Sequence, residues 1–476
     1  MSLILILHVL LVLSFSIRIL LRDDLSPPAR LAWFIVLLVL PYLGSLAYFL
    51  FGEIDLGNRA HRRHDEVFEQ IRKKAWRFMG EPFSANRLIR RVYRPAFHYG
   101  ASINGFHPVD GNRAQLMGDC DETIRQMIAD MDAATDHIHV LYYIWLNDGT
   151  GTEVAEALMR AAKRGVNCRA LADGLGSRVL IRSELWHRMK HAGVQVAVAL
   201  PIDRLVRTIF TSRLDLRNHR KITVIDGRIT YCGSRNCADP EFLPKARFGP
   251  WIDIMLRLEG PVVAQNQLLF ASDWMQATGQ SCDFAPLVAE PVADGFPAQV
   301  LGVGPTERPA AMPQLFTSLF ASTEHSLILT TPYFVPDPTT LEALCAAAWR
   351  GVTVTLVFPE RNDSWVVAAA SHSYYYRLLD AGCLIYEHGP GLLHSKTLTI
   401  DGKVSLIGSS NLDLRSFDLN YENNILMQDE AVTCAIIERQ REYIAQSRQV
   451  LLDEVLAWPY YRRIWNNVIA TIGPVL

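Results

Sequence analysis

The chain lacks a large excess of charge of either sign. Its 476 residues include 47 lysines and arginines and 49 aspartates and glutamates, which gives a formal net charge of −2. A protein without a strong basic field gains little attraction from the phosphate backbone of DNA or RNA. We therefore expect no nucleic-acid partner.

The eight cysteines lack C-x-x-C spacing. The common zinc and dithiol motifs are therefore absent, and we predict no metal site. Several cysteines lie in apolar, strand-like runs, as Cys168 does within 167–171. Buried free thiols in a reducing compartment are the simplest interpretation.

The N-terminus has little charge. Met1–Ile17 contains no charged residue, and Leu31–Phe51 is a second uncharged run of 21 residues. At 1.5 Å per residue the second run reaches about 31 Å, close to the roughly 30 Å hydrocarbon core of a bilayer. Pro41 could kink this run, which membrane helices tolerate. A cleaved signal peptide fits less well, because a basic n-region and a small-x-small cleavage site are both missing.

These two runs predict a transmembrane helical hairpin at 1–52 with both ends on one side. The loop between them carries Arg22 and Arg30, whereas seven basic residues follow the second run between Arg59 and Arg77. The positive-inside rule then places the main body in the cytoplasm. We expect a multi-pass membrane protein in which 53–105 forms a juxtamembrane connector.

One short pattern occurs twice: His-x-Lys-x4-Asp, followed by Gly-Ser and an asparagine. Each residue of the second copy lies 175 positions after its counterpart, and eight of the 18 aligned positions in 219–236 and 394–411 are identical. Ordinary composition would give roughly one match. The two copies are His219, Lys221, Asp226, Ser234 and Asn236, and His394, Lys396, Asp401, Ser409 and Asn411. We infer one site built from the two halves of a repeat.

The segments around the two copies follow the same order. From about residue 106, strand-like and helix-like runs alternate, which is typical of α/β architecture. The matched pairs are strands at 137–145 and 326–334, helices ending at 163 and 349, strands at 168–172 and 353–358, and helices ending before Gly193 and Gly382. We predict tandem α/β/α repeats with mixed sheets, at 106–290 and 291–476, that share one active site.

The spacing within each copy predicts its geometry. On a strand, residues i and i+2 point to the same face, so each histidine shares a face with its lysine. Asp226-Gly227 and Asp401-Gly402 have the composition of hairpin turns. The two aspartates therefore have two open interpretations, a part in the chemistry or a turn-building role.

Two imidazoles and two ammonium groups suit displacement at a phosphodiester. One histidine attacks phosphorus and forms a phospho-histidine, while the other protonates the leaving oxygen and later accepts a proton from the incoming hydroxyl. The lysines, with Asn236 and Asn411, offer donors to the non-bridging oxygens. An activated histidine also needs an acceptor on its second nitrogen, and Asp253 and Glu422, downstream of the two copies, are the candidates. The alternative for these two acids is exposure to solvent.

Two segments outside the pattern have a mixed basic and apolar composition. Gly193 and His219 are 26 residues apart, whereas Gly382 and His394 are only 12 apart. The extra length holds four arginines among apolar residues, and we expect either a membrane-surface segment or an ordinary loop. Trp458–Trp465 is likewise either an interface segment or a packed terminal helix.

The duplicated pattern resembles the phospholipase D superfamily and, more narrowly, bacterial cardiolipin synthases. Three further segments share this likeness: the N-terminal hairpin, Thr331–Asp337, and the stretch from Gly389 through the second copy to Glu422. The first copy departs slightly, because Ser234 stands where many such synthases have a second glycine. The resemblance covers essentially the whole chain.

The resemblance implies a reaction and a location. A phosphatidylglycerol would give its phosphatidyl group to His219 and release glycerol, with His394 as acid and base. The hydroxyl of a second phosphatidylglycerol would then attack to form cardiolipin. No metal or organic cofactor is implied, and the expected partners are phospholipids and the bilayer of the bacterial inner membrane.

Three alternatives remain open at this point. The protein could hydrolyse phosphodiesters as a membrane-anchored phospholipase D, or it could be a cardiolipin synthase that uses phosphatidylethanolamine as a co-substrate. A non-catalytic lipid-binding protein is a further alternative, although both His-x-Lys pairs are intact. The sequence leaves the oligomeric state and the acyl-chain preference undetermined.

Overall fold

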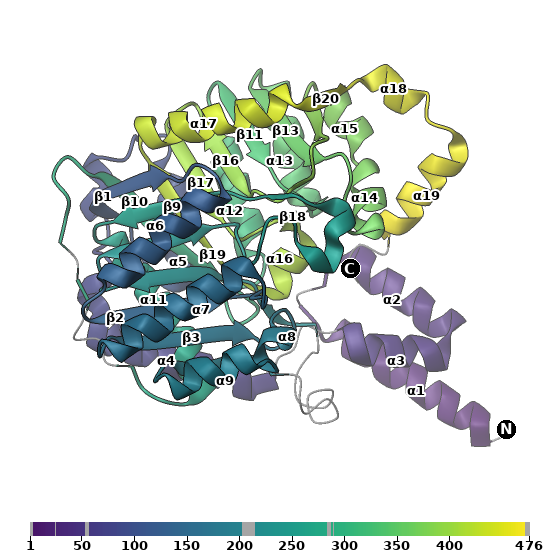
Figure 1. Cartoon of the computed structure of the whole chain (residues 1–476). Helices are drawn as coiled ribbons and strands as arrows, with labels where there is room; N and C mark the ends of the chain where they lie inside the picture. Colours follow the sequence, from purple (N-terminus) through teal and green to yellow (C-terminus); the bar gives the residue numbers. More distant parts are fainter. Residues whose placement is uncertain are drawn as a thin grey trace. The chain divides into compact units, whose positions relative to one another are not determined.

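The computed structural model describes residues 3–23, 25–52, 57–201, 215–282, 287–288 and 290–471. They divide into two compact units. Of the described residues, the first contains 3–23, 25–52, 57–61 and 215, and the second contains 62–201, 216–282, 287–288 and 290–471. The two units are described separately below, and Figure 1 gives the element labels.

Three helices make up the described N-terminal part of the first unit. They are α1 (Leu3–Leu20), α2 (Pro27–Val39) and α3 (Pro41–Phe51). Ser26 caps α2 by accepting a hydrogen bond from the Ala29 N–H, and Pro27 occupies the first turn, where its missing N–H costs nothing. Ile19, Leu37 and Tyr48 form the small core of this unit, one from each helix.

The described residues of this unit do not contain the expected pair of long membrane-spanning helices. The run at 31–51 is divided between α2 and α3, because Leu40 leaves the helical region (φ −129°, ψ 66°) ahead of Pro41. A proline disfavours helical geometry in the residue before it. Among the residues described here, none of the helices combines the length and apolar character needed to cross a membrane.

The second unit is built on two copies of one strand order. The first copy runs β1-β9-β7-β6-β2-β3-β4, and the second runs β10-β19-β17-β16-β11-β13-β14, with β20 added at the edge. The first-copy strands are β1 (Val109–Leu116), β2 (His137–Tyr142), β3 (Asn167–Asp173), β4 (Gln195–Ala199), β6 (Lys221–Ile225), β7 (Ile229–Gly233) and β9 (Met255–Glu259). The second-copy strands are β10 (Phe296–Val303), β11 (Ser326–Thr330), β13 (Thr353–Pro359), β14 (Leu384–His388), β16 (Thr397–Ile400), β17 (Val404–Gly408), β19 (Asn420–Gln428) and β20 (Ser447–Val450).

The two copies join into one sheet along β1 and β10, which pair antiparallel. Within each copy, parallel and antiparallel pairs are mixed, as in β2 with β3 and β2 with β6. The predicted mixed-sheet α/β repeat is therefore confirmed.

Helices cover the sheet and form three large cores. The helices α6 (Cys120–Ala133), α7 (Gly149–Lys163) and α9 (Glu184–His191) pack in one cluster on the first copy, and α12 (Ala311–Ala321) and α13 (Pro338–Trp349) pack in another on the second. Between the two copies lies a shared core around α11 (Val262–Thr278), which also includes residues of α17 (Glu430–Ala445). In Figure 1, α6, α7 and α9 lie in front of the first-copy strands.

The predicted helix ends and Asp-Gly turns are confirmed, whereas the strands predicted at 137–145 and 326–334 are shorter and end at Tyr142 and Thr330. Gly193 and Gly382 follow their helices with φ of 95° and 93°, the left-handed geometry that glycine adopts without strain. Asp226 and Gly227 have φ of 51° and 63°, and the Arg228 N–H donates to the Ile225 carbonyl at 3.0 Å. This is the type I′ turn expected of Asp-Gly, and it recurs after β16.

Candidate active site

Two short parallel strand pairs position the histidines. In the first, β5 (Arg217–Asn218) pairs with the start of β19, and the His219 N–H donates to the Tyr421 carbonyl at 2.8 Å. In the second, β15 (Leu392–Leu393) pairs with β8 (Trp251–Ile252), and the His394 N–H donates to the Ile252 carbonyl at 2.9 Å. Tyr421 directly precedes Glu422, and Ile252 directly precedes Asp253. Each histidine therefore lies next to the candidate acid of the other repeat.

The acids pair with the histidines across the repeats. His219 Nδ1 lies 2.8 Å and 2.9 Å from the two Glu422 carboxylate oxygens, and His394 Nδ1 lies 2.6 Å from Asp253 Oδ1. Burial would raise the pKa of each acid, but the neighbouring histidine and lysine charges outweigh it and both pKa values are lowered. Because an ionised carboxylate only accepts, each imidazole donates its Nδ1–H, and Nε2 is the remaining nitrogen.

The serines of the repeated pattern support these acids. Ser234 Oγ donates to Asp253 Oδ1 at 2.6 Å, and Ser409 Oγ donates to Glu422. Each hydroxyl also accepts a backbone N–H, from Ile254 at 3.0 Å and from Asn423 at 2.9 Å. Each serine thus orients the acid of its own repeat. That acid in turn orients the histidine of the other repeat.

The pKa values of both histidines are lowered, which favours the neutral imidazole. Burial lowers the pKa of His219 and of His394 to about 4, although the paired acids act in the opposite direction. The ammonium groups of Lys221 and Lys396 lower the pKa of both imidazoles further. An unprotonated Nε2 is the form that can act as a nucleophile.

Each lysine bonds to the backbone carbonyl of its histidine. Lys221 Nζ donates to the His219 carbonyl at 2.6 Å, and Lys396 Nζ donates to the His394 carbonyl at 2.6 Å. Burial lowers the pKa of Lys221 to about 8 and that of Lys396 well below its usual value. Each ammonium has three N–H donors, so donors remain for a bound anion.

Both histidines line one cavity of about 280 Å³. The Tyr143 ring packs against His219 with centroids 4.9 Å apart, and the Trp251 ring packs against His394 at 4.5 Å. Asn236 and Asn411 of the repeated pattern also line this cavity, and so does Asn420. Among the described residues, no group of three or more histidine, cysteine, aspartate or glutamate side chains is arranged to hold a metal ion.

The cavity is lined by several charged residues that sequence reasoning missed. Lys245 Nζ bonds to Asp363 Oδ2 at 2.5 Å, and the Tyr333 hydroxyl donates to Asp363 Oδ1 at 2.7 Å. Asp413 and Arg415 also face the cavity, and burial raises the pKa of Asp413 to about 6. Asp413 and Arg415 follow the second pattern by two and four residues, which is the only sequence signal that could have found them.

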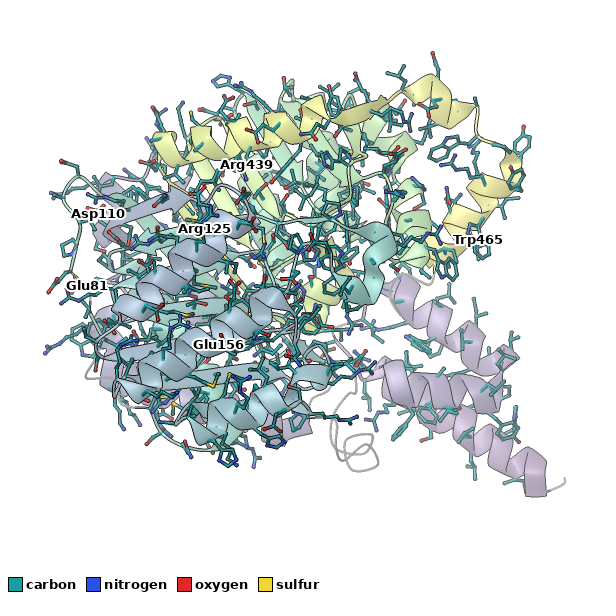
Figure 2. All side chains as sticks on the ribbon, viewed as in Figure 1. Glu81, Asp110, Arg125, Glu156, Arg439 and Trp465 are labelled. Carbon is teal, nitrogen blue, oxygen red and sulfur yellow. The ribbon has the colours of Figure 1, made fainter. Side chains whose placement is uncertain are left out.

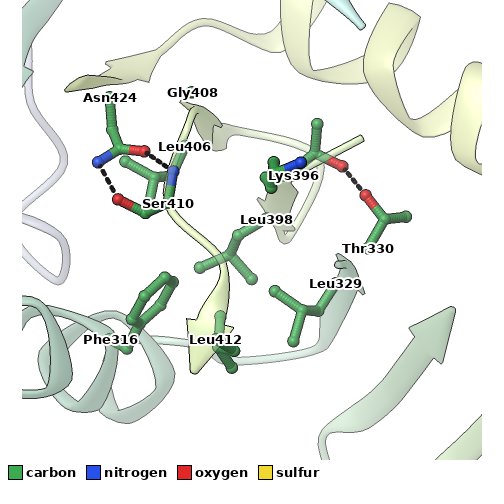
Figure 3. Close-up of a pocket in the computed structure, with 11 residues that line it drawn as sticks. Phe316, Leu329, Thr330, Lys396, Leu398, Leu406, Gly408, Ser410, Leu412 and Asn424 are labelled. Carbon is green, nitrogen blue, oxygen red and sulfur yellow. Dashed lines mark hydrogen bonds between the residues drawn. The ribbon is translucent and has the colours of Figure 1, made fainter. Parts of the chain in front are cut away.

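Hydrogen bonds with Asn424 fix the loop that carries the second pattern (Figure 3). Asn424 Nδ2 donates to Ser410 Oγ at 2.7 Å, and the Ser410 N–H donates to Asn424 Oδ1 at 3.2 Å. Lys396 is at the edge of a small second cavity there, beside Leu398 and Leu412. Asn411 donates from Nδ2 to Ser416 Oγ at 3.2 Å, which fixes its side chain at the catalytic cavity.

The structure does not bring Asp226 and Asp401 to the histidines. Strand β6 separates Asp226 from Lys221, and its carboxylate accepts the N–H groups of Thr135, Asp136 and His137 at 2.9–3.0 Å. Asp401 likewise accepts three backbone N–H groups, from residues 324 to 326, at 2.7–3.0 Å. Of the two interpretations, this geometry favours the turn-building role.

Part of the basic and apolar segment before the first pattern, residues 202–214, lies outside the described residues. Arg217 at its end is buried, with its guanidinium 3.6 Å from Asp173, which also accepts the Asn218 N–H at 3.0 Å. Arg217 therefore belongs to the support of His219 and not to a surface.

Comparison with known proteins agrees with this geometry. The family described as cardiolipin synthase, PLD-like domain, matches residues 127–265 and 316–445, one match for each repeat. The family described as phospholipase D-nuclease N-terminal matches residues 9–53. Two curated relatives are the cardiolipin synthases A of Proteus mirabilis (strain HI4320) and Serratia proteamaculans (strain 568), which are 35% and 36% identical to this chain. Each alignment covers 98% of this chain and 96% of the relative.

A solved structure shares the fold. The phosphatidylserine synthase of Haemophilus influenzae Rd KW20 matches with a TM-score of 0.58 and 14% identity, over 82% of this chain and 100% of that chain. The family matches in both repeats and the near-full-length relatives indicate the same family. The chain therefore belongs to the cardiolipin synthase family of phospholipase-D-like proteins.

Proposed function

We propose that this protein is a cardiolipin synthase that transfers a phosphatidyl group from one phosphatidylglycerol to another. The observation that carries the proposal is the crossed pair of histidines, each oriented on Nδ1 by a buried carboxylate and both lining one cavity. Two such imidazoles can divide one displacement at phosphorus into two easier steps.

In the first step, His219 Nε2 attacks phosphorus, and the bond from phosphorus to the glycerol oxygen breaks. His394 Nε2 gives a proton to that oxygen, and glycerol leaves. The negative phosphodiester raises the histidine pKa values on binding, because an adjacent anion favours the imidazolium. This charge offsets the burial that lowers the pKa of His394.

In the second step, the primary hydroxyl of another phosphatidylglycerol occupies the position that glycerol left. His394 Nε2 accepts the hydroxyl proton, the new oxygen-phosphorus bond forms, and the bond to His219 breaks. Cardiolipin is released with both histidines restored. Lys221, Lys396, Asn236 and Asn411 supply N–H donors for the non-bridging oxygens, whose charge must be stabilised throughout.

The remaining predicted residues have supporting roles. Asp253 and Glu422 keep the tautomer and orientation of the imidazoles, and Ser234 and Ser409 position these acids. Asp226 and Asp401 anchor the strand ends. We further propose boundaries at 106–290 and 291–476 for the two catalytic domains, after a connector at 53–105.

We also propose that the protein works at the inner membrane of a bacterium, with the catalytic repeats on the cytoplasmic side. The apolar N-terminal helices, whose sequence matches a known N-terminal family, support attachment to the bilayer. Attachment concentrates lipid hydroxyls at the site, where water competes for the phospho-histidine. Protease accessibility in sealed vesicles of known orientation tests the sidedness.

Lipid product analysis tests the proposed reaction. Purified protein in detergent is incubated with phosphatidylglycerol, and the products are separated by mass spectrometry. Cardiolipin together with glycerol supports transfer, whereas phosphatidic acid alone would establish hydrolysis instead. A parallel incubation with added phosphatidylethanolamine distinguishes the two possible co-substrates by whether ethanolamine is released.

A further inference from the structure

Two helices far apart in the sequence form an exposed aromatic face. Helix α19 (Tyr460–Thr471) packs on α14 (Trp365–His372) through Ile469, and the Trp365 and Trp465 rings stack with centroids 5.9 Å apart. Figure 2 labels Trp465 on this face. Six large side chains of these two helices are 50–82% exposed: Trp365, Tyr460, Tyr461, Ile464, Trp465 and Val468. We call these six residues the α14–α19 face.

The charge on these two helices is of one sign. Neither α14 nor α19 contains an acidic residue, and α19 contains Arg462 and Arg463. Exposed apolar clusters of this size are unusual on soluble proteins. Tryptophan and tyrosine beside arginine are typical of segments at the boundary between lipid and water.

The face adjoins the catalytic cavity along the chain. Asp363, which lines that cavity, is followed directly by Ser364, the N-cap of α14, and then by Trp365. Helix α14 therefore begins two residues after a residue of the cavity wall.

A further cavity of about 130 Å³, distinct from the two described above, lies between α19 and the segment 372–376. Its lining includes Arg463, Asn466 and Trp458. Asn466 is only 4% exposed, yet its Nδ2 has no hydrogen-bond partner within the described chain. An unpaired buried donor is costly unless a ligand or water satisfies it.

The two adjacent arginines differ in their surroundings. Arg462 is stacked over the Trp458 ring, with the guanidinium carbon 3.9 Å from the centroid. Arg463 lines the cavity, and no side-chain hydrogen bond or ion pair holds its guanidinium in the part of the chain described. A guanidinium presents paired donors that match the oxygens of a phosphate.

We propose that the α14–α19 face docks on the bilayer and that the cavity between α19 and the segment 372–376 binds the phosphate of an anionic phospholipid headgroup. The Arg463 guanidinium and Asn466 Nδ2 donate to the phosphate oxygens, while the exposed aromatic rings enter the lipid interface. The occupant is a membrane lipid and not free phosphate, because the apolar face and the donors belong to the same helix. This inference rests on the proposed function only in taking phospholipid as the substrate class.

Hydrogen exchange of the full-length protein in nanodiscs tests the proposal locally. Exchange at α14 and α19 is compared between discs of phosphatidylcholine alone and discs that also contain phosphatidylglycerol. Arg463→Gln removes the proposed phosphate contact, and Arg462→Gln is the matched control because it removes the same charge one residue away. A third sample holds the protein in phosphatidylcholine discs with added inorganic phosphate.

We expect exchange at α19 to slow about tenfold with phosphatidylglycerol, the size of one charge-assisted contact. Arg463→Gln should abolish this difference and Arg462→Gln should retain most of it. The proposal is overturned if phosphatidylglycerol leaves exchange unchanged, if both variants behave alike, or if inorganic phosphate protects α19 equally.

The outcome is separable from the catalytic proposal. His219→Ala should keep the protection of α19 although it makes no cardiolipin. If the wild-type protein made no cardiolipin yet showed lipid-dependent protection, the proposed reaction would fail and the docking face would stand.

Discussion

The crossed pairing of acids and histidines predicts which acid serves which chemical step. Glu422 lies in the second repeat but bonds to His219, the proposed nucleophile, and Asp253 lies in the first repeat but bonds to His394. Glu422→Gln should therefore impair formation of the phosphatidyl-enzyme, and Asp253→Asn should impair protonation and the second step. Pairing within each repeat would reverse the two effects.

The expected size follows from the bonds that are lost. Glu422 is fully buried and accepts from both His219 and Ser409. A hydrogen bond to a charged group contributes about 1.5–3 kcal/mol. An amide of the same shape keeps an acceptor but loses the charge, so the step should slow roughly 10- to 150-fold, at 1.36 kcal/mol per decade.

Single-turnover quench experiments measure the two steps separately. Labelled phosphatidylglycerol is mixed with excess enzyme, and protein-bound and released label are followed over time. The adduct should form slowly with Glu422→Gln and accumulate with Asp253→Asn. The matched control is Glu387→Gln, another buried acid, bonded to Tyr375 and Arg448 away from the cavity. Adduct that accumulates in Glu422→Gln but fails to form in Asp253→Asn would refute the crossed assignment.

Three further predictions concern other parts of the site. Burial lowers the pKa of Lys221 to about 8, so its ammonium loses a proton as pH rises through that value and kcat/KM should fall above about pH 8. A kcat/KM that stays constant up to about pH 10 would contradict a role for the Lys221 ammonium. Asp226→Ala leaves three backbone N–H groups without their acceptor, so the free energy of unfolding, measured by denaturation, should fall by about 2 kcal/mol. The activity per folded molecule, measured by assay of the folded fraction, should stay within a fewfold of the wild-type value. Ser234→Ala and Ser409→Ala each remove one bond to an acid and should each lower kcat about fivefold with little change in KM; loss in one variant alone would show that the two acids are not supported alike.

The local features of this fold could be predicted because they depend on neighbouring residues. The Asp-Gly turns and the glycines that end helices both follow from backbone geometry over a few positions. The repeated order of strands followed from two matching series of such signals. Their agreement in both halves also predicted a single site between them.

The pairings across the site could not be predicted in the same way. His219 meets Glu422 because β5 pairs with β19, a contact between segments about 200 residues apart that no local pattern encodes. The Lys245–Asp363 ion pair and the Trp251–His394 contact depend on the same kind of distant packing. At the N-terminus, the apolar composition of 31–51 predicts one kinked span, but the geometry required before Pro41 divides it into two helices.

In the proposed reaction, His219 carries the phosphatidyl group between the two lipids. The most direct test is to trap the adduct in His394→Ala with phosphatidylglycerol and to map the modified residue by mass spectrometry under conditions that preserve phospho-histidine. We predict the phosphatidyl group on His219 and its complete absence from His219→Ala, which should also make no cardiolipin. An adduct at full level on another residue, or normal cardiolipin synthesis by His219→Ala, would contradict the mechanism.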